Sequence, residues 1–224
     1  MIDNKEIVAL IPAKDDSKRI KNKNFQTLSG KSLIGRKILQ LQQSKHIDRI
    51  VVGSKSEKVL DEAKKYGAET ITEHEYEYYQ SANKMIHNLV TKIQTDIVLW
   101  AHATNPFISA STYDKAIKTF QQNLVNNQYD SLLSVYKIQE HFWTERHTPL
   151  NYNPYGEQHT LAKDLPPIYA QDGGIFIQPY QQMLENSYFF GKKPYLFQID
   201  EQEIFDINVE KELYIAKALA KYYD

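Results

Sequence analysis

The chain has 224 residues, 42% of them hydrophobic and 25% charged, with a formal net charge of −1 and no cysteine. A chain of this length buries enough surface to fold without disulfides or a structural metal, and the absence of cysteine excludes disulfides and thiolate metal sites. The near-zero charge argues against nonspecific nucleic-acid binding and no apolar run could span a membrane, so we expect a cytoplasmic protein with neither kind of partner.

Apolar runs alternate with helical patterns over most of the chain. Several runs are continuous, as is typical of strands covered on both faces. This alternation predicts an α/β fold of three layers, with a mostly parallel sheet between helices. Ser56 and Ser111 are the predicted helix caps. In chain order we expect strand 7–11, helix 33–43, strand 50–53, helix 56–66, strand 70–72, helix 81–94, strand 97–101, helix 111–123, strands 131–136, 174–177 and 195–199, and helix 209–222.

Residues 139–167 interrupt this pattern with a stretch rich in Pro, Tyr, Asn and His. A structureless loop of such length is unusual inside a compact domain. We therefore expect a small excursion from the sheet, within a single domain that covers residues 1–224. Its aromatic residues, among them Trp143 and Tyr155, suggest a surface that needs a partner.

The loop that follows the first predicted strand is dense in lysine, with Lys14, Lys18 and Lys23. Its position puts positive charge at the carboxyl edge of the sheet, where open α/β folds bind ligands. These lysines, the Ser17 hydroxyl and the loop amides could together hold a triphosphate. The alternative is a solvated basic loop without a ligand.

The same loop resembles a known nucleotide-binding loop. Ile11-Pro12-Ala13, Ser17-Lys18 and Lys23-Asn24 match that of the acylneuraminate (CMP-N-acetylneuraminate) cytidylyltransferases, which activate acidic sugars. Lys14 stands where this family usually has Arg, and so lacks the bidentate fork of a guanidinium. Further segments resemble the family in the same order along the chain: residues 48–52 with 62–69, 104–107, 165–169 with 172–176, and 205–208.

The resemblance implies a Rossmann-like nucleotidyltransferase sheet and a homodimer formed by the excursion at about residues 139–167. It implies Mg²⁺ as cofactor, and CTP and an acidic, nonulosonate-like sugar as substrates. The products would be pyrophosphate and a CMP-sugar for surface glycan synthesis. Lys23, Lys14 and Asp206 would be catalytic, and the nucleotide would be bound by Ala13, Lys14, Ser17, Lys18, Lys23 and Asn24.

Asp206 and Asn208 are the predicted metal ligands. They lie two residues apart, so they share one side of an extended segment. Mg²⁺ prefers oxygen ligands and often uses one or two carboxylates with substrate phosphates. Asn208 stands where the family usually has a second Asp, and Asp15 and Asp16 either supply the missing charge or repel a triphosphate. The alternative is a turn that caps the last helix through Asn208.

The resemblance also assigns candidate sugar contacts. His102, just after a predicted strand, either contacts the sugar or is a satisfied loop histidine. Asp172 and Gly173 offer a close backbone approach, because Gly lacks a Cβ. Phe176 packs on the sugar or in the core. Lys163 and Tyr169 are the remaining predicted sugar-binding residues.

Two other functions stay open. A homologue that binds nucleotide without turnover would fit the loss of the usual Arg and second Asp. A glycosyltransferase of related fold would also fit, but it should carry an Asp-x-Asp after a mid-chain strand. Residues 97–136 contain no such motif.

Overall fold

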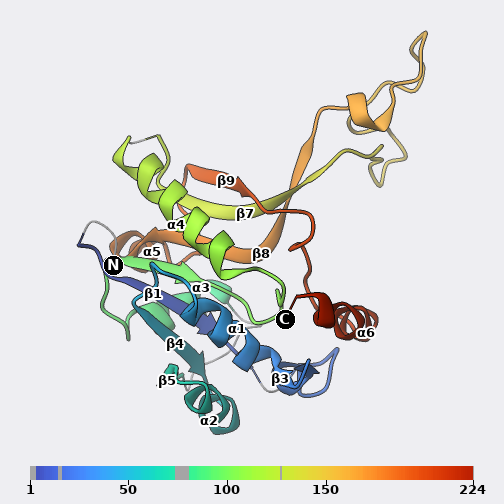
Figure 1. Ribbon diagram of the computed structural model, residues 1–224. Helices are drawn as coiled ribbons and strands as arrows, with labels where there is room; N and C mark the ends of the chain where they lie inside the picture. The colour runs from blue at the N-terminus through green and yellow to red at the C-terminus, as the bar shows by residue number, and fades with distance from the viewer. Residues whose placement is uncertain (1–3, 15–16, 74–80, 127, 224) are drawn as a thin grey trace.

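The computed structural model describes residues 4–14, 17–73, 81–126 and 128–223, and within them a seven-stranded sheet (Figure 1). The strand order is β5-β4-β1-β6-β8-β7-β9. Strand β8 runs antiparallel to both neighbours, and the other adjacent pairs are parallel. Their bounds are β1 Ile7–Pro12, β4 Arg49–Ser54, β5 Glu69–Thr72, β6 Ile97–Trp100, β7 Ser131–Ile138, β8 Ile168–Pro179 and β9 Pro194–Gln198.

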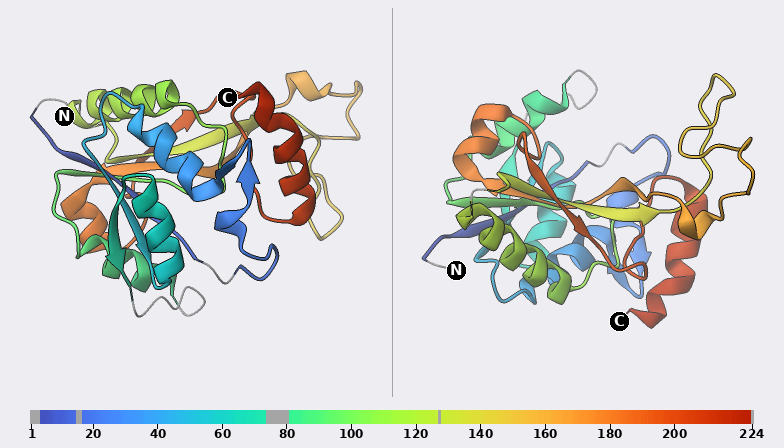
Figure 2. Two further views of the ribbon diagram at one scale, coloured as in Figure 1. Left: turned by 60° about the horizontal axis from the view of Figure 1, so that its bottom comes forward. Right: turned by 90° about the horizontal axis from the view of Figure 1, so that it is seen from above.

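Helices cover both faces of the sheet, as the right view of Figure 2 shows with the sheet nearly edge-on. Helices α1 (Leu33–Gln42), α2 (Glu57–Lys65) and α4 (Ala110–Val125) pack on one face. Helices α3 (Ala82–Val90) and α5 (Tyr180–Asn186) pack on the other. The predicted three-layer α/β fold with a mostly parallel sheet is therefore confirmed.

Strand β1 shows why the sheet is buried on both sides. Its side chains alternate between two apolar clusters, with Ile7 and Ile11 facing the α1 side and Val8 and Leu10 facing the α3 side. All four are fully buried. A strand that contacts helices on both faces must be apolar at every position, which is the continuous pattern in the sequence.

A third apolar cluster supports the loop that follows β1. Helix α6 (Glu210–Leu219) supplies Leu213 and Ala216, which pack with Ile20 of the loop and with Leu28. Leu28 belongs to a two-stranded hairpin of β2 (Thr27–Leu28) and β3 (Lys31–Ser32), which α6 contacts. The C-terminal helix thus holds the N-terminal loop at one end of the sheet.

Residues 139–167 leave the sheet between β7 and β8 and project from the body as an arm (Figures 1 and 2). The arm contains the short helix η2 (Ala162–Asp164) and a bridge between Trp143 and Pro149. Trp143 and Tyr155 are largely exposed, at 55% and 86% of their surface. The arm occupies the interval between the end of β7 at Ile138 and the start of β8 at Ile168.

The predicted element ends needed some corrections. Ser109, not Ser111, caps α4, because its Oγ accepts a hydrogen bond from the Thr112 amide. Ser56 is at the predicted cap of α2, although its side chain makes no capping bond. Helix α5 was not predicted, and β8 extends well beyond the expected 174–177. Short 3-10 helices also occur, η1 (Lys23–Phe25) in the loop after β1 and η3 (Ala220–Tyr222) after α6.

Strand β8 has a bulge at its contact with β7. The register shifts between Leu133 and Val135, and the extra residues of β8 bend out around Ser134. The Ser134 hydroxyl donates to Asp172 Oδ1 and accepts from the Ile175 amide at 2.8 Å. Gly174 permits this bend, since a Cβ there would lie 2.2 Å from Ile108 Cδ1 and 2.8 Å from Asp172 Oδ2.

We expect Gly174→Ala to lower the free energy of unfolding by about 1–3 kcal/mol, because the added methyl overpacks a buried site. Urea unfolding monitored by circular dichroism measures the change. Gly156→Ala in the exposed arm is the matched control, since the nearest atom to its Cβ is 3.7 Å away. Equal midpoints for the two variants would contradict the steric account of the bulge.

Candidate active site

A cavity of about 400 Å³ opens at the carboxyl ends of β1 and β6. Its walls come from the loop after β1, the segment after β6, the bulge of β8 and the segment before α6. These four segments are far apart in sequence and meet because the parallel strands end at one edge. The lining residues are Pro12, Lys14, Ser17, Lys18, Arg19, Lys23, Asn24, His102, Ala103, Thr104, Gln171, Asp172, Gly173, Asp206 and Asn208.

Within this cavity, Lys23 links the loop after β1 to the segment that precedes α6. Its Nζ donates a hydrogen bond to the carbonyl oxygen of Ile207 at 2.9 Å. Burial lowers the pKa of Lys23, and the nearby Asp206 carboxylate opposes that shift. Asn22 precedes it in the left-handed region, with φ of 53°, which turns the loop back toward the sheet. Lys23 is therefore a held side chain and not a solvated one.

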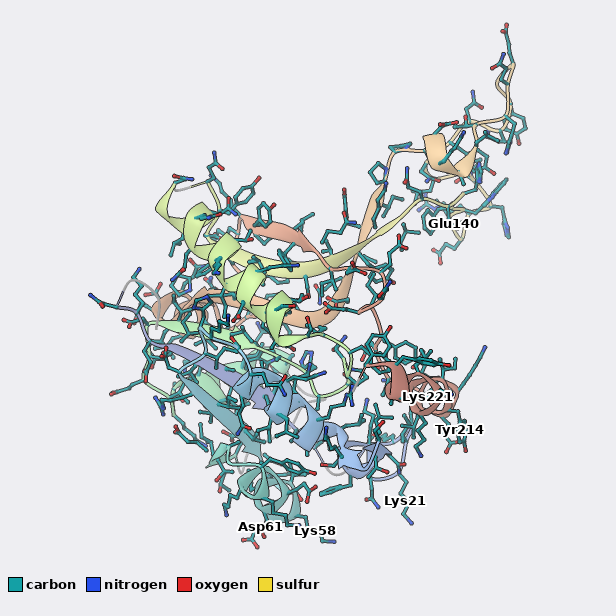
Figure 3. All side chains as sticks on the ribbon, viewed as in Figure 1. Lys21, Lys58, Asp61, Glu140, Tyr214 and Lys221 are labelled. Atoms are coloured by element: carbon teal, nitrogen blue, oxygen red, sulfur yellow. The ribbon has the colours of Figure 1, made fainter. Side chains whose placement is uncertain are left out.

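The other lysines of the loop divide between the cavity and solvent. Lys14 and Lys18, two of the predicted nucleotide contacts, line the cavity together with Ser17. Lys21 points away from the body into solvent (Figure 3). Asn24 is buried, and its Nδ2 donates to the carbonyl of Lys14 at 2.5 Å, so its predicted nucleotide contact would compete with a structural bond. Ala13, a predicted nucleotide contact, is buried beside Pro12 and is absent from the described lining.

Asp206 and Asn208 both reach the cavity, and Arg19 joins them. The Asn208 amide donates from Nδ2 to Asp206 Oδ2 at 2.6 Å, and its Oδ1 accepts from Arg19 Nη2 at 3.2 Å. Asp206 Oδ1 is buried and makes no hydrogen bond to any described residue. One carboxylate oxygen is thus held by a neighbour and the other is available to a ligand.

The alternative of Asn208 as a helix cap is wrong. Helix α6 begins after its N-cap residue, Val209, and Glu212 accepts from the two backbone amides that precede the helix. Glu212 Oε2 accepts from the amides of Asn208 at 2.5 Å and Val209 at 2.9 Å. The Asn208 side chain is therefore free of the helix and turned to the cavity.

His102 is a neutral histidine whose ring nitrogens are both engaged. The indole of Trp100 donates to its Nε2 at 3.1 Å, so the proton lies on Nδ1, which is 2.7 Å from the carbonyl oxygen of Gly173. Burial lowers the pKa of His102, although the Gly173 carbonyl opposes the shift. Phe189 and Phe176 approach the ring edge-on. His102 lines the cavity as a satisfied histidine, with no nitrogen left for a sugar.

Asp172 and Gly173 occupy the bulge of β8 and form one wall of the cavity. Burial raises the pKa of Asp172, against the hydrogen bonds from Ser134 and the Gly174 amide. Asp172 Oδ2 is buried without a hydrogen-bond partner in the described part of the chain. Gly173 has a φ of +80°, a conformation that other residues adopt only with strain.

Three predicted sugar contacts lie outside the lining of this cavity. Phe176 is buried on the α3 side of the sheet, where it stacks on Phe189 with ring centroids 5.1 Å apart. Tyr169 is half-exposed near the start of β8 and borders a groove at the edge strand β9. Lys163 lies in the arm, in η2. The bulge explains why the Phe176 side chain faces the α3 side of the sheet and not the cavity, because extra residues in a strand change which face the following side chains occupy.

Sequence reasoning missed Arg19, Gln171 and Thr104, which also line the cavity. Arg19 directly follows Ser17-Lys18, so its charge and position in the loop were available signals. Asp15 and Asp16 lie outside the described residues. Within the described ranges, no group of three or more His, Asp or Glu side chains is arranged to hold a metal, and no helix has the length and apolar character needed to cross a bilayer.

Sequence comparison with known proteins assigns the chain to a family. A family model described as "Cytidylyltransferase" matches residues 8–221. The chain is 30% identical to CMP-N,N'-diacetyllegionaminic acid synthase of Legionella pneumophila, over 85% of this chain and 86% of that protein. It is 26% identical to pseudaminic acid cytidylyltransferase of Campylobacter jejuni, over 96% of each chain.

A solved structure of CMP:2-keto-3-deoxy-manno-octonic acid synthetase, complexed with CTP, has the same fold. Its TM-score is 0.71 at 14% sequence identity, over 97% of this chain and 99% of that one. The resemblance drawn from the loop after β1 and from the segments around Asp172 and Asp206 is therefore confirmed. This chain belongs to the cytidylyltransferase family.

Proposed function

We propose that this protein transfers CMP from CTP to an acidic, nonulosonate-like sugar and releases pyrophosphate, with Mg²⁺ as cofactor. The observation that carries the proposal is the meeting of loop cations and the Asp206 carboxylate in one cavity. Supporting it, relatives that match along nearly the whole chain are named for CMP transfer to pseudaminic and legionaminic acids.

The loop after β1 would hold the triphosphate. Lys14, Lys18 and Lys23 provide three cations on one wall, and Arg19 adds a guanidinium beside Asn208. Cations fixed before the substrate arrives stabilise the charge that develops at phosphate without reorganisation. Lys23 is the best placed to act on the reacting phosphate, because its bond to Ile207 fixes it next to Asp206.

The residues present fit a magnesium ion. Asp206 offers one buried oxygen that no described residue hydrogen-bonds, and Mg²⁺ is commonly bound by one or two carboxylates together with phosphates and waters. The ion would neutralise charge on the triphosphate. Asn208 already accepts from Arg19, so it supports Asp206 and retains one lone pair for a ligand.

The acceptor sugar would lie against the β8 bulge. Asp172 and Gln171 offer polar groups there, and Gly173 permits close approach. The sugar hydroxyl would attack the α-phosphorus of CTP in line with the departing pyrophosphate, so the wall that orients the sugar matters as much as the cations. Lys163, in the arm, and Tyr169, at the start of β8, both lie outside this cavity. Their proposed contact with the sugar therefore requires a second subunit, which ties it to a homodimer.

Release of pyrophosphate from CTP, assayed with a panel of acidic keto sugars, tests this function. Turnover that depends on both substrates supports the proposal. Binding of CTP without turnover for any sugar would favour a nucleotide-binding homologue, and transfer from a nucleotide sugar would favour a glycosyltransferase.

We expect Lys23→Met to lower kcat by about 10²–10³, the usual cost of losing a preorganised charge at a reacting group. It should also destabilise the protein by about 1 kcal/mol, through loss of the bond to Ile207. Lys21→Met is the matched control, because Lys21 belongs to the same loop and points into solvent. Steady-state kinetics of both variants decide the matter, and equal rates would make Lys23 a structural residue.

Asp206→Asn and Asn208→Asp should change metal affinity in opposite directions. The first removes the anchoring carboxylate and should weaken Mn²⁺ binding, and the second adds a charged oxygen and should strengthen it. Titration of Mn²⁺ by electron paramagnetic resonance, with CTP present, measures both. An unchanged Mn²⁺ curve for Asp206→Asn would place the metal elsewhere.

We expect a homodimer at micromolar concentration, formed largely by the arm. The arm exposes Trp143, Leu150 and Tyr155, and such apolar surface is normally covered by a partner. Sedimentation velocity of wild type and Trp143→Glu should show a dimer and a shift toward monomer. Tyr214→Glu, at an exposed aromatic residue of α6, is the control. A wild-type monomer would rule the dimer out.

A further inference from the structure

The side chain of Asn105 hydrogen-bonds to the backbone of two walls of the cavity. It is fully buried in the segment between β6 and α4 and does not itself line the cavity. Its Nδ2 donates to the carbonyl of Asp172 at 2.9 Å and to the carbonyl of Phe205 at 3.3 Å. One amide group thus holds the backbone of the β8 bulge and the backbone just before Asp206.

A neighbouring backbone bond reinforces the second contact. The amide of Ile207 donates to the carbonyl of Thr104 at 2.9 Å. Ile207 in turn accepts from Lys23 through its own carbonyl. The segment around Asn105 is therefore connected to both carboxylate-bearing segments and, through Ile207, to the loop after β1.

Helix α1 fixes Asn105 from the opposite side. Lys37, which is fully buried, donates from Nζ to the carbonyl of Asn105 at 2.8 Å and to the hydroxyl of Tyr113 at 2.7 Å. Arg36 and Gln40 donate to the carbonyl of Pro106 at 2.8 and 2.7 Å. Three side chains of one helix thus hold two consecutive carbonyls, which leaves this segment little freedom to move.

Burial of a lysine ammonium group costs free energy unless the group is hydrogen-bonded or paired, and Lys37 is hydrogen-bonded to Asn105 and Tyr113. Burial lowers the pKa of Lys37 to about 7, opposed by the charge of Asp172, while Arg36 adds to the lowering and Glu203 opposes it. Helix α1 could fill this position with an apolar residue, as it does at Ile34 and Ile38. Lysine at position 37 instead provides a hydrogen-bond donor to the carbonyl of Asn105, the residue whose side chain bonds to both walls of the cavity.

We propose that Asn105 is a positioning residue that sets the separation between the Asp172 and Asp206 walls of the cavity, with Lys37 as its support. The proposal rests on the proposed function in one respect: the two walls are those assigned to the sugar and to the metal. A single amide that bonds to both walls links their positions, whereas two separate anchors would let each wall move alone. The separation matters because the attacking hydroxyl must lie in line with the α-phosphorus.

Asn105→Ala removes both hydrogen bonds and tests the proposal by amide hydrogen exchange. We expect the amides of Ile175, in the bulge, and Ile207, before α6, to exchange about tenfold faster or more, as each lost bond contributes modestly to local stability. Asn83→Ala is the matched control. Its Nδ2 joins α3 to the end of α5 by a 2.9 Å bond to the Ser187 carbonyl, away from the cavity. Its loss should leave both amides unchanged.

Kinetics separate positioning from simple stabilisation. At a temperature where the variant is folded, Asn105→Ala should lower kcat by about 10- to 100-fold, while KM for CTP and for the sugar change little, because each wall still binds its own substrate. Unchanged kcat, or faster exchange in one wall alone, would overturn the proposal.

Should Asn105→Ala fail to fold, Asn105→Ser provides the second test. Its single hydroxyl donor cannot serve two carbonyls, so exchange should rise in at least one wall and kcat should fall. Wild-type exchange at both amides would overturn the proposal. If the wild type itself shows no turnover, the proposed function fails, and the exchange experiment still decides whether Asn105 joins the walls.

Discussion

The hydrogen bond from Lys23 to the carbonyl of Ile207 closes the site, because it joins the loop after the first strand to the segment before the last helix. Burial of an ammonium group is unfavourable, and the lowered pKa of Lys23 reflects that cost. The Asp206 charge and the bond to Ile207 offset it. The remaining support is apolar, from the packing of Ile20 and Leu28 against Leu213 and Ala216 of α6. A loop so rich in like charges would otherwise favour solvent.

The carboxylates of the site illustrate a second constraint. Asp172 and Asp206 each keep one buried oxygen without a hydrogen-bond partner among the described residues, although buried polar atoms are normally satisfied. Each other oxygen is engaged, by Ser134 for Asp172 and by Asn208 for Asp206. This pattern leaves each carboxylate oriented by one oxygen and open to a ligand at the other, as a site for cations or hydroxyl donors requires. The structure tolerates the cost where a ligand can remove it.

Sequence patterns predicted the layers of the fold and the loop of the site better than its details. Continuous apolar runs such as residues 7–11 identify buried strands directly, because both faces of the sheet demand apolar side chains. The loop after β1 was identified by its charge and its place at a strand end. The β8 bulge could not be predicted, since it depends on the pairing of Ser134 with Asp172 across two strands. For Phe176 the structure selects the core alternative, since its side chain is buried in the apolar cluster on the α3 side of the sheet.

Asn208 shows a related limit. From sequence it was either a metal ligand or a helix cap, and neither reading included Arg19, which lies 189 positions away in the chain. Asn105 was noted only as part of the family-like segment 104–107, with no role assigned to it, and Lys37 was not singled out because a lysine in a helix is usually a surface residue. Their roles appear only when α1 packs against the segment after β6. Tertiary contacts between distant segments, rather than local propensity, decide such polar positions.

The most direct test of the account is the position of the metal. Crystals grown with Mn²⁺ and a nonhydrolysable CTP analogue would give an anomalous signal from the ion alone. We expect that signal within bonding distance of Asp206 Oδ1, with the triphosphate against Lys14, Lys18 and Lys23. A metal bound away from Asp206, or a nucleotide bound outside this cavity, would contradict it.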